Sequence, residues 1–174
     1  MFTVRQAQPL DYNNIVKLRF ESFISCHDKD YERMIKSSPV CYVATTDDNK
    51  VIGVCLCKQS HNYQFGNIGI IETLCVHRKY RNIGVGTQLI KETENALIEN
   101  YGCTGVILQV RITNKAARHL YEKTFGFVQQ QILEGYYGNE DGLLMYQKFK
   151  ISQLENSDLT SFRIEQWKED VAFA

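Results

Sequence analysis

One short segment near the middle of the chain constrains its fold more than any other. Residues 81–87 contain two glycines, follow the apolar run 68–76, and lead into residues 87–100, whose apolar side chains recur near helical spacing. This order predicts a strand, a glycine turn and a helix. The segment consists of Arg81, Asn82, Ile83, Gly84, Val85, Gly86 and Thr87.

Such a turn predicts a binding place for phosphate. Glycines let the backbone turn sharply and come close to a ligand with no Cβ in the way. The start of the following helix presents unpaired N–H groups and the positive end of its dipole. A plain link between strand and helix would carry the same pattern, so the segment alone leaves both interpretations open.

The composition fits one globular domain and excludes a broadly charged surface. The 174 residues are 44% hydrophobic, and 20 Lys plus Arg balance 20 Asp plus Glu. A net charge of zero creates no wide field that would gather nucleic acid or anionic membrane, so any anion site must be local. The sequence shows no run of about 18 apolar residues that would span a membrane, and no secretory signal. We therefore expect a cytoplasmic protein that binds neither nucleic acid nor membrane directly.

The six cysteines indicate buried free thiols rather than a disulfide framework or a metal site. Cys55 and Cys57 would share one face of a strand, but no second pair of Cys or His at ligand spacing accompanies them. We expect no metal.

The first half of the chain predicts an antiparallel meander of strands, with helices after the first strand. Residues 2–7, 41–45, 51–59 and 67–76 have strand patterns, with a turn at 47–50 and a polar loop at 60–65. Asp11 can cap a helix, and a second, short helix is expected at residues 29–37. The apolar stripe of the first helix is Tyr12, Ile15, Val16, Phe20 and Phe23.

The second half predicts a parallel crossover, then a helix and a hairpin. The helix after the glycine turn leads to a strand at 105–110, which would lie parallel to 67–76. Asn114 then caps a helix with one apolar face, Gly126 ends it, and strands follow to about residue 133 and at 142–149. In residues 151–174, a short helix would pack on the domain or on a partner.

A second motif, Asn114-x-x-Ala117-x-x-Leu120-Tyr121 followed by Gly126-Phe127, identifies a family. The order strand, Arg-x-x-Gly-x-Gly, helix, strand, Asn-x-x-Ala-x-x-Leu-Tyr, Gly-Phe resembles the GNAT acetyltransferase superfamily over most of residues 2–149. The resemblance implies an α/β (α+β) fold with a mixed, largely antiparallel sheet of about seven strands that splays into a V, about four helices and a C-terminal helix. Residues 1–150 would form the acetyltransferase domain and residues 151–174 a helical C-terminal extension.

The resemblance also implies that acetyl-CoA is the cosubstrate. The amides of the glycine turn, with Arg81, would hold the pyrophosphate, and the strand end Leu74-Cys75-Val76 would pair with the pantetheine arm and offer an amide to the thioester oxygen. Asn114 would fix the cofactor. Tyr121 would serve as general acid, because a thiolate with a pKa of about 8.5 needs only a modest proton donor. Without the companion motifs, Tyr121 would be interpreted as a core aromatic on an apolar helix face.

The chain departs from the family at the expected base. Many bacterial relatives carry Glu, and some eukaryotic ones His, at the position that matches Gln109, and an amide accepts no proton at neutral pH. Glu72 is the nearest substitute, two residues before Leu74 and expected on the same strand face. It is the candidate base or amine-binding group, acting through a water, with a solvated strand carboxylate as the alternative. His27 and His119 are weaker candidates.

Two features favour a protein α-amine as the acceptor. About 10–15% of an α-amine with a pKa of about 7.8 is neutral at pH 7, against about 0.04% of a lysine with a pKa of about 10.4, so an enzyme without a strong base suits the α-amine. The segment Tyr136-Tyr137…Glu140-Asp141-Gly142 resembles the tyrosine loop that closes over the substrate peptide in N-alpha-acetyltransferases, with Gly142 in place of the usual Ala. A packed β-hairpin is the alternative for the tyrosine pair.

The spacing within the second motif gives further support. Tyr121 and Gly126 are separated by four residues, one more than usual in the superfamily, and some eukaryotic catalytic subunits that modify nascent chains share this spacing. The acceptor would enter between the tyrosine loop and the first helix pair, where Phe23, His27 and Tyr31 would line its path.

These expectations combine into an N-terminal protein acetyltransferase that transfers acetyl directly in a ternary complex. An auxiliary subunit or the ribosome could be a partner, and the oligomeric state stays open. An acetyltransferase for a small amine or a lysine side chain is the alternative. A CoA-binding or assembly module with little catalysis is a third interpretation, indicated only by Gln109 and the tail.

Overall fold

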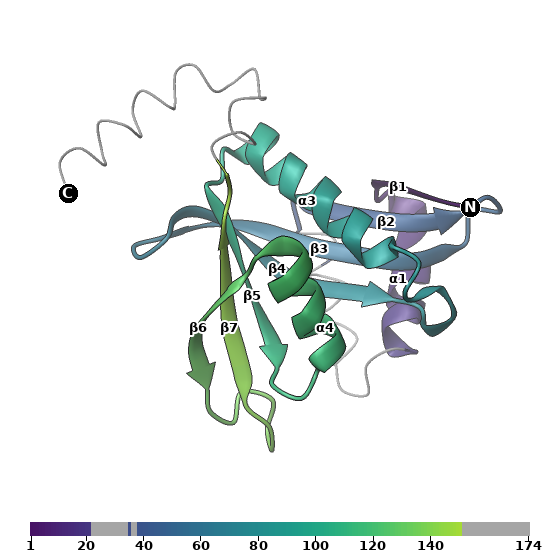
Figure 1. The fold of residues 1–174 in the computed structure, drawn as a ribbon. Helices are drawn as coiled ribbons and strands as arrows, with labels where there is room; N and C mark the ends of the chain where they lie inside the picture. The colour runs from purple at the N-terminus through teal and green to yellow at the C-terminus, as the bar shows by residue number, and fades with distance from the viewer. Residues whose placement is uncertain (22–34, 36–37, 151–174) are drawn as a thin grey trace.

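The computed structural model describes residues 1–21, 35 and 38–150, which form one sheet with helices on both faces (Figure 1). Helices α3 (Val85–Tyr101) and α4 (Lys115–His119) cover one face, and α1 (Tyr12–Phe20) covers the other. Most of the helix predicted at 29–37 and the whole of 151–174 lie outside the described residues. The predicted acceptor residues Phe23, His27 and Tyr31 lie outside them too.

The sheet has seven strands in the order β1-β2-β3-β4-β5-β7-β6, which confirms the mixed, largely antiparallel sheet. Strands β1 to β4 form the predicted antiparallel meander, β5 runs parallel to β4, and β7 pairs antiparallel with both β5 and β6. The strands are β1 (Phe2–Gln6), β2 (Val40–Thr46), β3 (Val51–Asn62), β4 (Gly66–Val76), β5 (Gly105–Arg111), β6 (Val128–Leu133) and β7 (Gly142–Lys148).

Half of the polar loop predicted at 60–65 is strand. Strand β3 continues to Asn62, which pairs with Gly66, and the side chains of Gln59 and Asn67 are hydrogen-bonded across the hairpin at 2.6 Å. Most side chains of β3 beyond Cys57 are exposed, so this end of the hairpin projects past the core and carries no apolar alternation. Backbone pairing forms the strand there, and a hydrophobic pattern could not reveal it.

Each face of the sheet has its own apolar core. Helix α3 buries Leu89, Ile90 and Leu97 against one face, whereas α1 buries Ile15 and Leu18 against the other. The predicted stripe of α1 is wrong at Phe20, which is 52% exposed, and it omitted Leu18. The predicted Tyr12 and Val16 pack against the same core as Ile15 and Leu18, and the departure comes at Phe20, the last residue of the helix.

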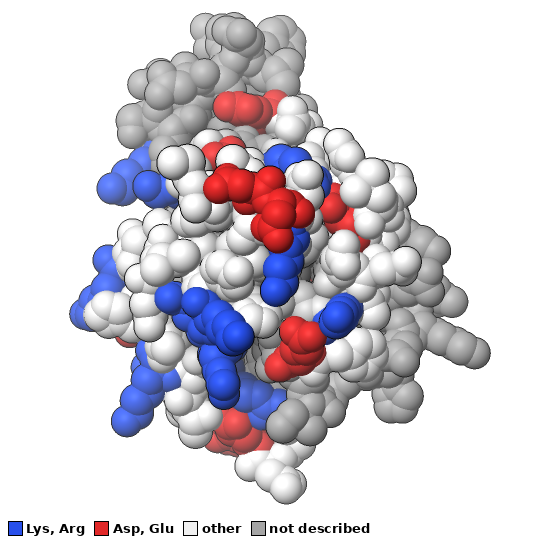
Figure 2. Space-filling view, turned by 90° about the vertical axis from the view of Figure 1, so that its right-hand side faces the viewer, with Lys and Arg blue, Asp and Glu red and all other residues white. Residues whose placement is uncertain are grey.

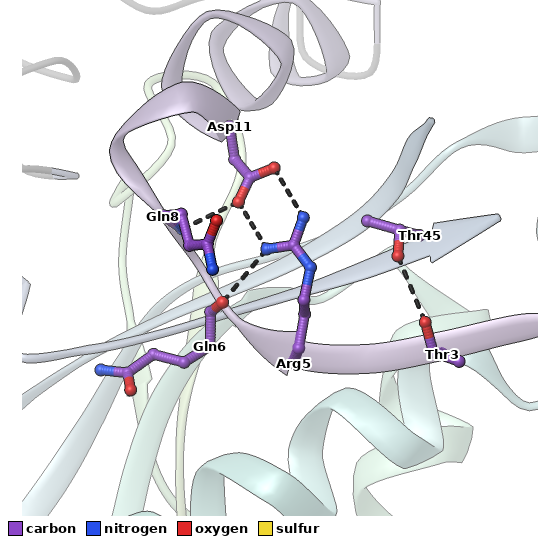
Figure 3. A network of polar contacts seen from close by, with 6 residues as sticks. All are labelled: Thr3, Arg5, Gln6, Gln8, Asp11 and Thr45. Atoms are coloured by element: carbon purple, nitrogen blue, oxygen red, sulfur yellow. Dashed lines mark hydrogen bonds and ion pairs between the residues drawn. The ribbon is translucent and has the colours of Figure 1, made fainter. Parts of the chain in front are cut away.

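A bidentate ion pair joins β1 to the start of α1 (Figure 3). The guanidinium of Arg5 donates to both carboxylate oxygens of the buried Asp11, at 2.6 and 2.9 Å, and the N–H of Gln8 donates to the same carboxylate at 2.8 Å. The hydrogen bond from Arg5 is the main cause that lowers the pKa of Asp11. Asp11 does precede α1 as predicted, but its carboxylate accepts hydrogen bonds from Arg5 and Gln8 and makes no cap hydrogen bond to α1. The prediction that its side chain caps this helix is therefore wrong. In the same view, the hydroxyls of Thr3 and Thr45 meet across β1 and β2 at 3.3 Å.

The five described cysteines are buried and free, as predicted. Cys55 and Cys57 belong to the same core cluster, and burial raises the pKa of Cys55 to about 12, so it stays a thiol. Among the described residues, no group of three or more His, Cys, Asp or Glu side chains could hold a metal ion. No helix in the described part of the chain is long and apolar enough to cross a membrane.

Candidate active site

The glycine turn links β4 to α3 through left-handed backbone. Asn82 has a φ of 63° and Gly84 a φ of 89°, conformations that Asn tolerates better than most residues and that Gly adopts freely. The first hydrogen bond of the helix runs from the N–H of Gln88 to the carbonyl of Gly84 at 3.0 Å. The amides of residues 85–87 therefore precede the helical ladder and remain available for an anion. Helix α3 begins at Val85, two residues before the predicted start.

The turn lies against the end of β4 and against the helix that carries Tyr121. A methyl placed on Gly86 would lie 3.4 Å from Cδ2 of Leu120 and 3.8 Å from Cγ2 of Val76. Arg81 folds back so that its Nε donates to the carbonyl of Val76 at 3.1 Å. The two predicted motifs therefore meet in space, as the resemblance implied, with the strand end between them.

Strands β4 and β5 separate beside this turn. Their parallel pairing runs from Ile68 with Gly105 to Ile71 with Leu108. Beyond that pair, β4 stays with β3 as far as Val76, and β5 stays with β7 as far as Arg111. The edge of residues 74–76 that faces β5 has no strand beside it among the described residues. Unpaired strand edges can bind an extended ligand through backbone hydrogen bonds.

A β-bulge at the separation point turns Glu72 onto the face opposite Leu74. The register of β4 against β3 skips Glu72, because Ile71 pairs with Cys57 and Thr73 with Leu56. Leu74 packs in the α3-side core. Glu72 instead contacts Lys58, which follows the α3-side residue Cys57 and so points the other way. The prediction that Glu72 and Leu74 share a face is wrong for this reason.

The Glu72 carboxylate is paired with an ammonium group. The Nζ of Lys58 lies 2.5 Å from Oε1 of Glu72, with the two side chains 49% and 17% exposed. Ile71 and Leu108 form the last pair between β4 and β5. Glu72 and Gln109 come directly after them, one on each of the diverging strands. Because Leu108 belongs to the α3-side core, Gln109 points to the same face as Glu72. We call this the acceptor face.

Tyr121 lies on the opposite side of the separation, in a π-helical segment. Helix α4 continues directly into η3 (Leu120–Phe125), where the N–H of Gly126 donates to the carbonyl of Tyr121. A π-turn accommodates one extra residue in a helix, which accounts for the longer Tyr121–Gly126 spacing. The side chain is 6% exposed and packs 5.5 Å from the ring of Phe127. Burial raises the pKa of Tyr121, with smaller contributions from Cys55 and Tyr137.

Asn114 caps α4 as predicted. Its Oδ1 accepts the N–H of Ala117 at 3.2 Å, and the residue itself is exposed at the end of the loop that follows β5. The cap fixes where the helix of Tyr121 begins, so it orients that helix over the separated strands. His119, one of the weaker candidates for the base, is exposed on the same helix.

The tyrosine loop between β6 and β7 lies at the end of β5. Tyr136 is 54% exposed and its ring meets that of Tyr137 edge to face, 4.9 Å between centroids. The guanidinium of Arg111 lies 4.3 Å above the Tyr137 ring, and its Nη1 donates to Glu140 at 3.0 Å. Arg111 shares the acceptor face with Gln109, two residues earlier on β5. The structure therefore brings Tyr137, Arg111 and Gln109 to one region.

Sequence reasoning missed Lys58, Arg111 and Glu140 as parts of this region. Glu140 was part of the quoted loop segment but had no role, and the other two carry no motif. Their partners lie 14 and 29 residues away in the chain, and the register of three strands brings them together. A periodic pattern of charge could not have found them.

The local charges fit an anion at the turn, whereas the acceptor face is balanced in charge. The turn combines free amides, a helix N-terminus and Arg81, and the acceptor face carries two ion pairs, Lys58 with Glu72 and Arg111 with Glu140, together with two tyrosines. Figure 2 views the molecule from the right-hand side of Figure 1 and shows both positive and negative side chains on that face, so no single sign dominates it. The arrangement can hold a phosphate-bearing, extended ligand along the end of β4 and an amine across from it.

Comparisons with known proteins agree with this geometry. The acetyltransferase (GNAT) family profile matches residues 11–127. The catalytic subunit ard1 of the N-terminal acetyltransferase A complex of Schizosaccharomyces pombe is 34% identical over 119 residues, which are 67% of this chain and 67% of that protein. N-alpha-acetyltransferase 30 of Mus musculus is 33% identical over 151 residues, covering 78% of this chain and 41% of that protein. The chain thus spans less than half the length of the mouse relative.

A solved structure shares the fold. A chain of the NatC complex bound to Gag peptide and CoA superposes with a TM-score of 0.76 at 22% identity, covering 86% of this chain and 99% of that one. The V-shaped separation of β4 from β5 and the helix layers therefore belong to a fold found in a complex with CoA and peptide.

Proposed function

The chain belongs to the acetyltransferase (GNAT) family, and from that premise we propose that it transfers acetyl from acetyl-CoA to the N-terminal α-amine of a protein or peptide. Both substrates would be bound at once. The observation that carries the proposal is the separation of β4 from β5, with Tyr121 on one side and Glu72 and Gln109 on the other. Such a gap lets a donor and an acceptor meet from opposite faces of one sheet.

The donor would be held by backbone groups. The amides of residues 82–87 and the side chain of Arg81 would bind the pyrophosphate, the strand edge at 74–76 would align the pantetheine arm, and Asn114 would fix the cofactor beside them. Acetyl-CoA supplies the activated acetyl thioester. The left-handed turn at Gly84 supports this fit, because a residue with a side chain would strain the backbone there.

Tyr121 would stabilise the leaving thiolate mainly as a hydrogen-bond donor. A thiol has an ordinary pKa of about 8.5, below that of a phenol at about 10, and burial raises the pKa of Tyr121 further. Complete proton transfer from the phenol to the thiolate is therefore uphill. The same shift keeps the phenol protonated at neutral pH, so it can donate a hydrogen bond throughout the reaction.

Glu72 would bind the acceptor amine or a water that removes its proton. Lys58 already pairs with this carboxylate at 2.5 Å, so an acceptor amine or water would share the carboxylate with Lys58 or displace it. The amide of Gln109 beside it can only hydrogen-bond. An α-amine suits this weak base best, since about a tenth of it is already neutral at pH 7.

The tyrosine loop and the names of the relatives support a peptide acceptor. Tyr136 and Tyr137 lie beside the acceptor face, where they could bind a peptide backbone. An acetyltransferase for small amines would instead suit an open acidic pocket, and the Lys58 that neutralises Glu72 argues against one. Because the S. pombe relative is a subunit of a complex, an auxiliary subunit is a partner worth testing.

The experiment is acetylation of matched peptides by the full chain. Peptides with varied first residues and one internal lysine would be offered in two forms, with a free and with a blocked α-amine. We expect CoA release and a single acetyl group on the α-amine of free peptides alone. Acetylation of the lysine or of free polyamines, with no α-amine product, would refute the proposal.

A further inference from the structure

Glu140 ties the tyrosine loop to the end of β5. Its carboxylate accepts hydrogen bonds from Nη1 of Arg111 at 3.0 Å, from the N–H of Thr113 at 3.1 Å, and from the Thr113 hydroxyl. These bonds and the ion pair lower the pKa of Glu140, so the carboxylate stays charged at neutral pH. The carbonyl of Glu140 in turn accepts the N–H of Tyr137 at 3.0 Å. Glu140 therefore bonds the end of β5 through its side chain and the tyrosine loop through its backbone carbonyl.

Arg111 carries this contact to the ring of Tyr137. The guanidinium of Arg111 lies 4.3 Å over the centre of the Tyr137 ring and also donates a hydrogen bond to Glu140. The hydrogen bond to Glu140 therefore holds the guanidinium in place over the ring. Stacking on a ring together with a charged hydrogen bond is a combination that Arg makes and Lys does not. Tyr137 is thereby restrained by its backbone through Glu140 and by its ring through Arg111.

Gly142 closes the third side of Tyr137. A methyl at this position would lie 3.2 Å from Cε2 of Tyr137 and 3.2 Å from Cβ of Tyr136, tighter than ordinary van der Waals contact. The two tyrosines therefore occupy the space that an alanine side chain at position 142 would need, and Ala is the usual residue at this position in the loop that this segment resembles. Gly142 pairs with Arg111 on β5, so the glycine and the guanidinium face Tyr137 from neighbouring strands.

We propose that Glu140, Arg111 and Gly142 are positioning residues that set the place of Tyr137 and so determine how tightly, and which, acceptor peptides bind. The inference rests on the proposed function, because it needs Tyr137 to contact the acceptor. The geometry connects it to the rest of the site: Arg111, whose guanidinium lies over the Tyr137 ring, is two residues from Gln109 on the same face of β5. Acceptor choice then depends on a loop that three residues hold from three sides.

The test separates acceptor binding from turnover. For Glu140→Gln we expect the peptide KM to rise about tenfold while kcat and the acetyl-CoA KM change less than about twofold, because only the loop loses its anchor. Arg111→Lys keeps the charge but loses the stack, and should raise the peptide KM by about fivefold. Gly142→Ala should shift the ranking of peptides by their first residues, with any single KM changing by about threefold.

The control is Glu122→Gln, which breaks the i,i+4 ion pair of Arg118 and Glu122 at 3.2 Å within the helix. It removes the same chemistry at similar exposure, and we expect no change in peptide KM beyond about 1.5-fold. Melting temperatures of all variants would verify folding. If Glu140→Gln alters the peptide KM no more than Glu122→Gln does, or lowers kcat alone, the positioning role is wrong.

The two proposals fail in different ways. If the wild-type chain acetylates no α-amine, the proposed function fails before any variant is compared. If the wild type is active and the ranking of peptides is the same for Gly142→Ala and the wild type, only the positioning role of Gly142 fails.

Discussion

The proposed donor and acceptor halves of the site are built by different means. The glycine turn and the strand end depend on backbone conformation, through the left-handed Asn82 and Gly84. The acceptor half depends on side-chain pairs, Lys58 with Glu72 and Arg111 with Glu140. Backbone geometry is fixed once the fold forms, whereas a side-chain pair changes with one substitution. An enzyme with one donor and many possible acceptors would benefit from this division.

Tyr121 is the residue proposed to contact the leaving thiolate, so its variant should have the largest effect on turnover. Tyr121→Phe removes the hydroxyl and keeps the ring that packs on Phe127. We expect kcat to fall about 100-fold with both KM values within about twofold, because the hydroxyl acts when the thiolate leaves. Since the pKa of Tyr121 is raised above its ordinary 10.0, wild-type turnover should not decline from its ionisation below about pH 10. Steady-state kinetics across pH would check both, and undiminished turnover of the variant would disprove the role.

A substitution that strains only the backbone of the glycine turn should weaken acetyl-CoA binding in the proposed donor half. Gly84→Ala meets no atom within 4 Å, but the left-handed φ of 89° disfavours a side chain by about 1–2 kcal/mol. We expect the acetyl-CoA KM to rise about tenfold while the peptide KM stays constant.

Gly66→Ala is the matched control for Gly84→Ala. Gly66 has a φ of 76°, its nearest neighbour is 3.9 Å away, and it is the first residue of β4, directly after the β3–β4 turn. Its variant should lose similar stability and keep both KM values. If both variants raise the acetyl-CoA KM equally, the effect is general destabilisation and the donor half is not specifically backbone-built.

The acceptor half should respond to a change of charge. Glu72→Gln keeps the shape but cannot take a proton, so we expect kcat to fall about tenfold and the pH–rate profile to move toward higher pH, where the amine is neutral without help. Rates from pH 6 to 10 would measure this. A variant with the wild-type profile would leave Glu72 as a structural partner of Lys58 only.

Glu94 tests whether helix α3 can change without disturbing either half. It is 4% exposed, and burial raises its pKa from 4.5 to about 7. A carboxyl with a raised pKa favours the folded state while protonated, so stability should decline by about 2–3 kcal/mol as pH rises from about 4.5 to 7. Glu94→Gln cannot ionise and should abolish this decline.

Denaturant unfolding of wild type and Glu94→Gln between pH 4.5 and 8 would measure the difference, which should grow with pH in favour of the variant. Both KM values at pH 7 should stay within about 1.5-fold of wild type, because Glu94 contacts Gln147 in the core and not the site. Parallel pH curves for the two proteins would contradict the ionisation of Glu94.

Local patterns were enough to predict most of the fold. The meander, the crossover helix and the Asn114 cap are short-range features, and the structure confirms them. Predictions failed at the last turn of α1, where Phe20 is exposed, and where backbone pairing needed no apolar residue, as at the end of β3.

The sequence by itself determined the backbone of the proposed donor half, because the order strand, glycine turn, helix is set by neighbouring residues, and the second motif around Asn114 and Tyr121 favoured a phosphate site there. Only the tertiary structure decided the acceptor half. The bulge at Glu72 depends on its register against β3, and the contacts of Arg111 with Glu140 and Tyr137 depend on three strands and a loop meeting. Neighbouring residues determine short-range backbone conformation, whereas side-chain pairs between distant segments form only once the sheet has set their positions.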